Sequence, residues 1–503
     1  MSLRENFRAA RWIRTANLVL QAILILTLFA GLNYLANNRA GGGDPWRFDL
    51  TRYRRFTLSP ETIAYVRELA SPVRIVVTEG EDNAPADLRG LLREYESVSE
   101  SNAAGGRITV DYIDVDLARR EAQQLGVEEP GSVFVLRGGY RQRQMLRIDE
   151  LYRFENQERS AFLGEKAITA AILNVASETR KKIYFLYGHS ELRPDDPDPV
   201  RGLSALRELL RQRNFDVDSP LLDLSATRQI PADASLLVSV QPQTRFSPAE
   251  QELLRQFLGA GDGRLMLFLA PGYEHGLDRL LHDWGVTVDN DLLRDNGAEN
   301  VTEDGDFIIG DFAPAHPVTQ ALLHSSYKAR LRLGPARTVR PDATRAAGNG
   351  LEVVTLAASS PTAWGEVDFA ARGAVSMNPG VDIRPLPSMD PPNRLGIGVA
   401  AEHVAARDNL PFSVRTGRLI VLGSGDLADN HRIADEGVFS LVIGAVNWMA
   451  DRDTQLPIPP RPIERFQLLL SPRELQNLRF CLMFILPGAA ALLGLIVYWT
   501  RRT

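Results

Sequence analysis

Two long stretches without a charged residue, one near each end of the chain, stand out in the pattern of polar and apolar positions. They cover Thr15 to Asn38 and Phe480 to Thr500. At about 1.5 Å of rise per helical residue, each is long enough to cross a hydrocarbon core about 30 Å thick. Tyr498 and Trp499 stand where interfacial aromatic residues belong. The pattern predicts a transmembrane helix at each end, with both termini on one side of the membrane.

A cleaved signal peptide is the alternative for the first stretch, because four arginines precede it. The length of the run and the lack of an Ala-x-Ala site after it favour an uncleaved anchor. A buried soluble helix would show a polar stripe, which this stretch lacks. Lys and Arg are similarly frequent on both sides of each span, so the positive-inside rule does not decide the orientation.

Strand and helix patterns alternate between the first span and Ser177. Ser59-Pro60-Glu61 predicts a helix start, with Ser as N-cap and Pro at the first helical position. The later elements read strand, helix, strand, helix, strand, strand, helix: 73–77, 86–98, 107–113, 117–125, 133–136, 144–148 and 162–176. This order resembles a thioredoxin-like fold, although the chain has no Cys-x-x-Cys motif and therefore no thioredoxin redox chemistry.

The alternation resumes after Arg180. Buried strands are predicted at 183–187, 235–240, 264–269 and 418–422, and helices at 202–213, 247–259 and 438–449. Ser247-Pro248-Ala249-Glu250 is a capping box that starts the second of these helices. Strands that alternate with helices predict a doubly wound parallel sheet. The segment 291–414 is rich in Pro and Gly, and we expect extra strands and long loops there.

These patterns predict an α/β protein flanked by two membrane helices. The expected divisions are a cytoplasmic tail and first helix (1–38), a thioredoxin-like domain (39–178), a doubly wound domain (179–455) with an irregular insertion (291–414), a juxtamembrane segment (456–479), and the second helix with a short basic tail (480–503).

Composition narrows the classes of function. The 503 residues are 44% hydrophobic and 24% charged, which is typical of globular domains, and the net charge is −6. This charge argues against nucleic acid as a partner, because counterion release needs clustered positive charge. The single cysteine, Cys481, lies at the edge of the second span. It excludes an intramolecular disulfide and a catalytic cysteine in the soluble part.

Ligands of open α/β sheets favour the carboxyl ends of strands. Three such ends carry small and polar residues: Gly188 to Glu191, Ala270 to Gly272, and Gly423 to Asp426. The candidate loop residues, for a ligand or a partner, are Gly188, His189, Ser190, Glu191, Pro271, Gly272, Ser424 and Asp426.

A hydrolase is one interpretation of these loops, with His189 as base, Glu191 orienting it, and Ser424 or Ser190 as nucleophile. Structural turns tied by His and Glu are favoured over it, because no Gly-x-Ser-x-Gly elbow is present. A metal site formed by His189, Glu191 and the acidic loop 195–198 is a weaker hypothesis, and Asp111, Asp114 and Asp116 fit a solvated strand end better than a metal site. We expect no cofactor, and no Walker A motif is present.

Separated stretches together resemble the GldG-type auxiliary proteins of ABC transport systems, a group named for gliding motility. They read RFTLSPETIAYVRELASPVRIVV, YGHSEL, RFSPAEQELLRQFLGAGDGRLMLFLAP, GRLIVLGSGDLADN and LSPRELQNLRFCLMFILPGAAALLGLIVYWTRR. The family loop usually reads Gly-His-Gly-Glu, and Ser190 replaces its second Gly. If that position needs a positive φ, a serine there is strained.

The resemblance implies a periplasmic body held by two helices in the inner membrane, with both termini in the cytoplasm. It implies a separate ABC permease and ABC ATPase as partners, an unknown cargo, a role as a candidate substrate-binding subunit, and a link to gliding motility or cell-envelope export. The first hypothesis is therefore a non-enzymatic accessory subunit. A membrane-tethered hydrolase or amidotransferase-like enzyme is the second. A purely structural scaffold is the third, and it would lack a pocket of ligand size.

Overall fold

The computed structural model describes residues 15, 17–31, 57–100, 102, 105–138, 142–177, 179–259, 263–324, 329–342, 350–369, 377–405, 414–450, 458, 460–463, 476 and 479–500. The chain forms two compact units, Met1–Arg461 and Pro462–Thr503. The end of the first predicted span (32–38) and most of the juxtamembrane segment lie outside the described residues.

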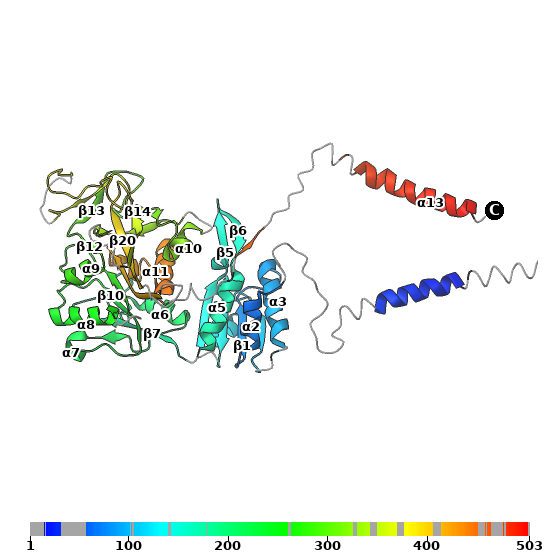
Figure 1. Cartoon of the computed structure of the whole chain (residues 1–503), viewed down its shortest axis with the longest axis horizontal. Helices are drawn as coiled ribbons and strands as arrows, with labels where there is room; N and C mark the ends of the chain where they lie inside the picture. The colour runs from blue at the N-terminus through cyan, green and yellow to red at the C-terminus, as the bar shows by residue number, and fades with distance from the viewer. Residues whose placement is uncertain are drawn as a thin grey trace, which may run out of the picture. The chain divides into compact units, whose positions relative to one another are not determined.

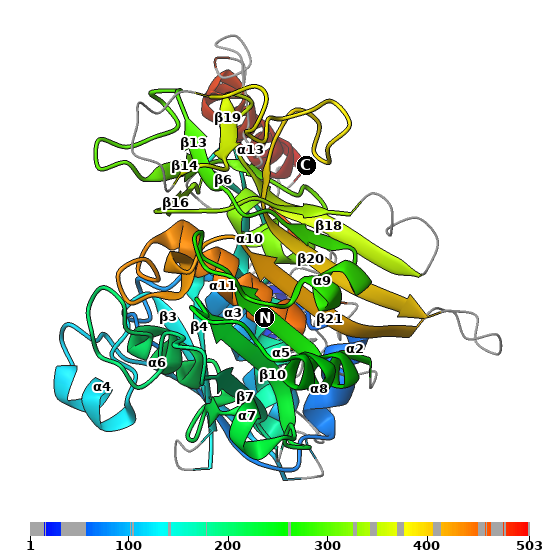
Figure 2. The same cartoon turned by 90° about the vertical axis from the view of Figure 1, so that its left-hand side faces the viewer.

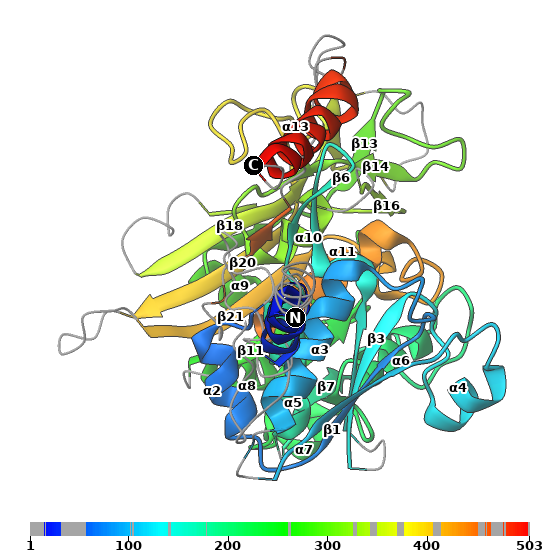
Figure 3. The ribbon, with the colours of Figure 1, turned by 90° about the vertical axis from the view of Figure 1, so that its right-hand side faces the viewer.

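A four-stranded sheet with the order β2-β1-β3-β4 organises the first part of the body. β1 and β2 are parallel, and β3 runs antiparallel to both β1 and β4. The strands are β1 (Val73–Val77), β2 (Ile108–Tyr112), β3 (Ser132–Arg137) and β4 (Gln142–Arg147). The helices are α2 (Pro60–Arg67), α3 (Ala86–Glu100), α4 (Arg119–Leu125) and α5 (Gly164–Ala176). Helices α2, α3 and α5 pack together beside the sheet (Figure 3), and α4 shares a core with Val76 and Phe134.

The predicted helix start at Ser59 is confirmed, because its hydroxyl accepts a hydrogen bond from the N–H of Thr62 (3.3 Å). A short 3-10 helix (Ile148–Leu151) and a hairpin between β4 and α5 were not predicted. The hairpin strands are β5 (Tyr152–Glu155) and β6 (Glu158–Phe162), and the late strand β22 (Arg461–Pro462) pairs with β6.

A nine-stranded sheet forms the larger part of the body, in the order β15-β18-β20-β21-β11-β10-β7-β8, with β9 also paired to β7. Its parallel strands are β7 (Lys181–Leu186), β8 (Phe215–Asp216), β9 (Leu221–Leu222), β10 (Ala234–Val240), β11 (Arg264–Phe268) and β21 (Val414–Leu422). Its antiparallel strands are β20 (Gly396–Ala405), β18 (Leu351–Ala358) and β15 (Asp311–Phe312). The prediction of a parallel sheet thus holds for six of the nine strands of a mixed sheet, and the three antiparallel strands come from the irregular segment. Figure 2 shows β18, β20 and β21 running side by side.

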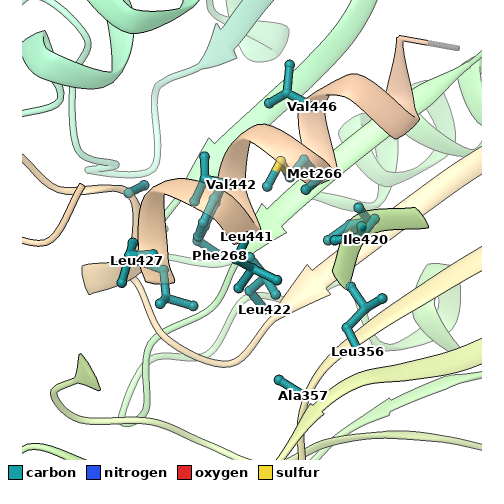
Figure 4. Close-up of a cluster of buried hydrophobic side chains, with 14 of the residues drawn as sticks. Met266, Phe268, Leu356, Ala357, Ile420, Leu422, Leu427, Leu441, Val442 and Val446 are labelled. Atoms are coloured by element: carbon teal, nitrogen blue, oxygen red, sulfur yellow. The ribbon is translucent and has the colours of Figure 1, made fainter. Parts of the chain in front are cut away.

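Both faces of the large sheet are buried. Ile183 and Phe185 of β7 face a core that includes Leu206 of α6 (Ser204–Gln212) and residues of α11 (Glu436–Met449). The alternate residue Tyr184 faces a second core, formed with α8 (Pro248–Gly259) and α9 (Asp278–Asp283). Figure 4 shows the first core, where Leu441 and Val442 of α11 meet Phe268 and Leu422 of the sheet. Side chains on opposite faces of one strand explain why the strands read as continuous apolar runs.

The irregular segment also builds three small two-stranded sheets, β12-β17, β13-β19 and β14-β16. Their strands are β12 (Val286–Val288), β17 (Val339–Pro341), β13 (Leu292–Asp295), β19 (Ala363–Glu366), β14 (Phe307–Ile309) and β16 (Leu331–Leu333). The remaining short helices are α7 (Leu224–Thr227), α10 (Gln320–Leu323) and the 3-10 turns Pro317–Thr319 and Asp426–Ala428. Figure 1 labels β12, β13, β14, α7 and α10.

One helix in the described chain is long and apolar enough to cross a membrane, Leu482–Trp499. It combines the π-helical turn Cys481–Ile485 with α13 (Leu486–Thr500). The helix Asn17–Gly31, within the first predicted span, is apolar but shorter. The second predicted span therefore contains a helix long enough to cross a membrane. Within the first predicted span, the described helix is shorter than that length.

Residues from the beginning and the end of the body meet at Glu165. One carboxylate oxygen of Glu165, in the first turn of α5, accepts a hydrogen bond from the N–H of Ser59 (2.5 Å), and the other pairs with Arg461. The Arg461 guanidinium also donates to the carbonyl oxygen of Thr57 (2.8 Å). Glu165 and Arg461 are both buried. A single buried ion pair therefore joins the segment after the first apolar helix to the segment before the second.

Candidate functional site

The strand order reverses at β7. β8 and β9 lie on one side of β7, and β10, β11 and β21 lie on the other. Helix α6 follows β7 and packs on one face, while α8 follows β10 and packs on the opposite face. Ligands of open α/β sheets bind at such a reversal. The predicted loop Gly188 to Glu191 follows β7 directly and therefore lies at this position.

His189 is held between two carboxylates, one in its own loop and one at the start of α8. Its Nδ1 lies 3.2 Å from Oε1 of Glu191, and its Nε2 lies 3.3 Å from Oε2 of Glu250 at the start of α8. The backbone N–H of His189 also donates to Oε2 of Glu191 (2.7 Å). The ring of Phe246 lies against the imidazole, with centroids 3.9 Å apart. All three ionisable side chains are buried.

The two carboxylates favour the charged imidazolium. Burial by itself would lower the pKa of His189, but the hydrogen bond that its ring donates to Glu191 and the negative charges of Glu191 and Glu250 outweigh it, so the pKa is raised. Burial would raise the pKa of Glu250, but hydrogen bonds from Ser247 and the charge of His189 lower it. The charge triplet is therefore mutually stabilised and fixes the loop after β7 to the N-terminus of α8.

Glu250 was predicted as part of a capping box, and that prediction is confirmed. The N–H of Ser247 donates to Oε2 of Glu250 (2.7 Å), and the N–H of Glu250 donates to the hydroxyl of Ser247 (3.3 Å). The contact of Glu250 with His189 was missed. A signal for it existed, because Glu250 opens the helix after β10, the neighbour of β7 in the sheet.

The loop backbone is unusual on both sides of His189. Ser190 has φ of 62°, in the left-handed region, and Gly188 has φ of 123°. The position that the family fills with Gly is thus one where a side chain costs free energy, as anticipated. A Cβ at Gly188 would lie 3.5 Å from Oδ1 of Asp223, the N-cap of α7. Both Gly188 and Ser190 are exposed.

The other predicted residues lie at the ends of β11 and β21. Pro271 is half-buried and Gly272 is exposed, with φ of 83°. The Ser424 hydroxyl is buried and donates to the carbonyl oxygen of Pro335 (3.0 Å). Asp426 is half-buried, and burial raises its pKa. A Cβ at Gly425 would lie 2.9 Å from the side chain of Gln241, so the loops after β21 and β10 are adjacent.

A buried arginine that sequence reasoning missed fills the space after β11. Arg337 donates to the carbonyl oxygens of Asp289 (2.8 Å), Tyr273 (3.1 Å) and Ala270 (3.4 Å). Its own N–H donates to the carbonyl oxygen of Gly423 (2.8 Å). Burial lowers the pKa of Arg337. The chain therefore uses its own side chain to satisfy the carbonyl groups where a ligand would otherwise bind.

A second charged group, also missed, surrounds Arg432 just after β21. Its guanidinium makes a two-point contact with Asp306 (2.6 and 2.9 Å), and its backbone N–H donates to Asp429 (2.7 Å). Burial and the charge of Asp426 raise the pKa of Asp429 to about 6, although the hydrogen bond from Arg432 opposes them. Asp306 precedes β14, so this contact fixes the irregular segment to the loop between β21 and α11.

The arrangement does not bring Ser424 to His189, and Ser190, the other candidate nucleophile, is exposed. Both ring nitrogens of His189 face carboxylates, and the Ser424 hydroxyl bonds to Pro335 rather than to His189. In the described part of the chain, no group of three or more His, Cys, Asp or Glu side chains could hold a metal ion. The contacts of His189 thus tie the loop after β7 to the start of α8.

A hollow in the irregular segment is lined by none of these loop residues. It has a volume of about 530 Å³ and is lined by residues of β14, β15, α10 and the end of β18. The loop after β7 and this hollow are therefore separate, and the hollow belongs to the irregular segment.

The fold and the site define a mixed α/β protein with a long apolar C-terminal helix and a charge-fixed loop at the reversal of its sheet. The family whose description is "ABC-type uncharacterized transport system" matches residues 180–440, and the chain belongs to this family. A domain of unknown function, DUF7088, matches residues 52–146. The chain has an auxiliary role associated with an ABC transport system, and with its apolar helix this indicates membrane association.

No curated protein matches the chain. Among solved structures, the chain is similar to the mmIFT52 N-terminal domain, with 16% sequence identity and a TM-score of 0.36. The match covers 55% of this chain and 99% of that one. A likeness at this level carries no argument about function.

Proposed function

We propose that this chain is a membrane-anchored, non-catalytic auxiliary subunit that binds a partner or cargo for a separate ABC permease and ABC ATPase. The family match over residues 180–440 is the observation that carries the proposal. The chain has no Walker A motif, so the ATPase must be another chain. Carboxylates engage both ring nitrogens of His189, which supports a role in binding over general-base catalysis.

Two anchors, with both termini in the cytoplasm and the body in the periplasm, complete the proposal. The apolar helices at the two ends and the Glu165–Arg461 pair support it, because that pair brings both tethers to one point of the body. The process served, gliding motility or cell-envelope export, follows from the resemblance to the GldG-type proteins.

We assign the first part of the body, 39–178, as a thioredoxin-like domain that serves as a scaffold, and 179–455 as the binding domain. The strand order β2-β1-β3-β4, with β3 antiparallel, supports the first assignment. The hollow of about 530 Å³ supports binding over a purely structural role, because small-molecule pockets commonly measure roughly 300–1,000 Å³.

Affinity purification tests the proposal. The tagged full chain, expressed from its own locus and extracted in a mild detergent, should bring down one ABC permease and one ABC ATPase in comparable amounts. A tagged two-span membrane protein of unrelated family, purified in parallel, is the control. Recovery of the chain without either protein would contradict the proposal.

A further inference from the structure

The hollow in the irregular segment is mostly apolar. Ile308, Phe312, Leu322 and Leu323 line it, and Leu323 is 40% exposed although it is a large apolar side chain. Exposed leucines that border a concave apolar surface are typical of ligand-binding sites. The lining thus favours a ligand with aliphatic groups.

Four charged residues also line the hollow, and two of them neutralise each other. Arg394 pairs with Asp311 (3.1 Å). The other two, Glu299 and Arg330, are exposed, and their side chains make no ion pair or hydrogen bond within the described residues. The hollow therefore offers one unpaired negative and one unpaired positive group.

The serine hydroxyls of the lining already make hydrogen bonds within the protein. The hydroxyl of Ser359 donates to the carbonyl oxygen of Ser360 (3.1 Å), and the hydroxyl of Ser360 donates to Asp295 (2.5 Å). A ligand would therefore find its polar contacts at the two charged residues and apolar contacts elsewhere.

Gly310 lines the hollow and adds no side chain to it. A Cβ at this position would meet only the Arg330 side chain, with Cγ at 3.9 Å and Nε at 4.0 Å. Arg330 thus lies beside a residue without a side chain, where a ligand can approach its guanidinium.

We propose that this hollow binds a short aliphatic peptide with free termini. The carboxylate of the peptide would pair with Arg330, its ammonium group with Glu299, and its side chains would contact Leu322 and the neighbouring apolar residues. A ligand with one charge would leave the opposite group of the protein unpaired, so a zwitterion fits the lining best. This inference rests on the proposed function, because it names the class of cargo.

Calorimetric titration of the full chain in lipid nanodiscs tests the inference. The probes are Leu-Leu, N-acetyl-Leu-Leu, which lacks the ammonium group, and Leu-Leu-amide, which lacks the carboxylate. We expect Leu-Leu to bind about tenfold more tightly than either derivative, equivalent to about 1.4 kcal/mol for one charge contact. Equal binding of the three probes, or binding of none, would overturn the inference.

Two charge variants assign each contact. Arg330→Gln should abolish the preference for Leu-Leu over the amide but keep the preference over the acetyl derivative, and Glu299→Gln should do the reverse. Arg120→Gln, at an exposed arginine of α4 without a partner among the described residues, is the control and should change neither. An effect of either variant on both preferences alike would contradict the assigned contacts.

A steric variant tests the location. Gly310→Phe should abolish binding of Leu-Leu, while Gly259→Phe, at another exposed glycine with open space around its Cβ position, should not. The affinity purification separates this inference from the proposed function. If the permease and ATPase copurify but no peptide binds, the peptide site is wrong and the auxiliary role stands; if Leu-Leu binds but neither copurifies, the auxiliary role is wrong.

Discussion

At the scale of single residues, His189 is the group on which the loop after β7 depends. Both carboxylates that contact it are buried, so removal of the imidazolium takes away the positive charge that faces both of them. We expect His189→Gln to lower the free energy of unfolding by about 3 kcal/mol, the usual cost of breaking a buried charge pair. Urea denaturation measures it, with the exposed His431→Gln as control.

The effect of this variant should depend on pH. The folded protein raises the pKa of His189, so the stabilisation is fully present below the ordinary value of 6.5 and is lost as pH rises through the folded pKa. The difference in unfolding free energy between the native chain and His189→Gln should therefore be larger at pH 6 than at pH 9. A difference that grows with pH would contradict the charged imidazolium.

Ser190 tests the strain in the same loop. Its φ of 62° is unfavourable for a residue with a Cβ, and glycine adopts it freely. Ser190→Gly should raise the free energy of unfolding by about 0.5–1 kcal/mol, whereas Ser190→Ala, which keeps the Cβ, should not. Thermal unfolding of the two variants side by side measures this. A loss of stability in Ser190→Gly would mean that the hydroxyl makes an essential contact.

Asp429 makes the junction beside Arg432 sensitive to acid. Its folded pKa is raised to about 6 from an ordinary 3.8, so the folded state binds this proton more tightly than the unfolded state does. The penalty for burying the charge is present above pH 6 and disappears as pH falls toward 4, and at about 1.4 kcal/mol per pH unit it reaches up to about 3 kcal/mol. Asp429→Asn should be more stable than the native chain at pH 7.5 and should lose that advantage at pH 4.5. An equal stability difference at both pH values would contradict the raised pKa.

At the scale of elements, the sequence predicted the long, strongly patterned segments. The strands at 73–77 and 264–269, and the helix start at Ser59, were placed to within a residue or so, because continuous apolar runs and end-cap residues are local signals. The hairpin β5–β6 was missed. It turns at Asn156 and Gln157, with φ of 51° and 67°, and carries no Gly or Pro that would mark a turn.

The candidate site was predictable only in part, for a related reason. The loop at 188–191 was found because small and polar residues follow a buried strand. Glu250, Arg337 and Arg432 were not placed in their roles, because their partners lie far away in the sequence. The pairing of β10 with β7 brings Glu250 to His189, and Arg432 meets Asp306 in the segment without clear periodicity. Tertiary pairing therefore decides these contacts, and local pattern does not reveal them.

Glu165 provides a test of the junction between the tethers. Glu165→Gln removes the buried carboxylate that pairs with the guanidinium of Arg461, and we expect a loss of about 2–4 kcal/mol in unfolding free energy. The double variant Glu165→Gln with Arg461→Gln should lose less than the sum of the two single variants, because each single variant breaks the same ion pair. Strictly additive losses in the double variant would show that the two side chains do not interact.

At the scale of the whole molecule, the account describes an α/β body that serves an ABC transport system from the membrane. The family match indicates an ABC transport system, and the apolar C-terminal helix indicates membrane association. The Glu165–Arg461 ion pair joins two parts of the body that are distant in the sequence. The hollow in the irregular segment is the place where we propose that cargo binds.

Sedimentation after an alkaline carbonate wash tests the membrane anchoring on which this account rests. Membranes from cells that express the full chain are washed, centrifuged at high speed, and probed for the intact protein in pellet and supernatant, before and after addition of detergent. We expect the chain to stay in the pellet through the wash and to enter the supernatant only with detergent. Intact chain in the supernatant without detergent would contradict the account.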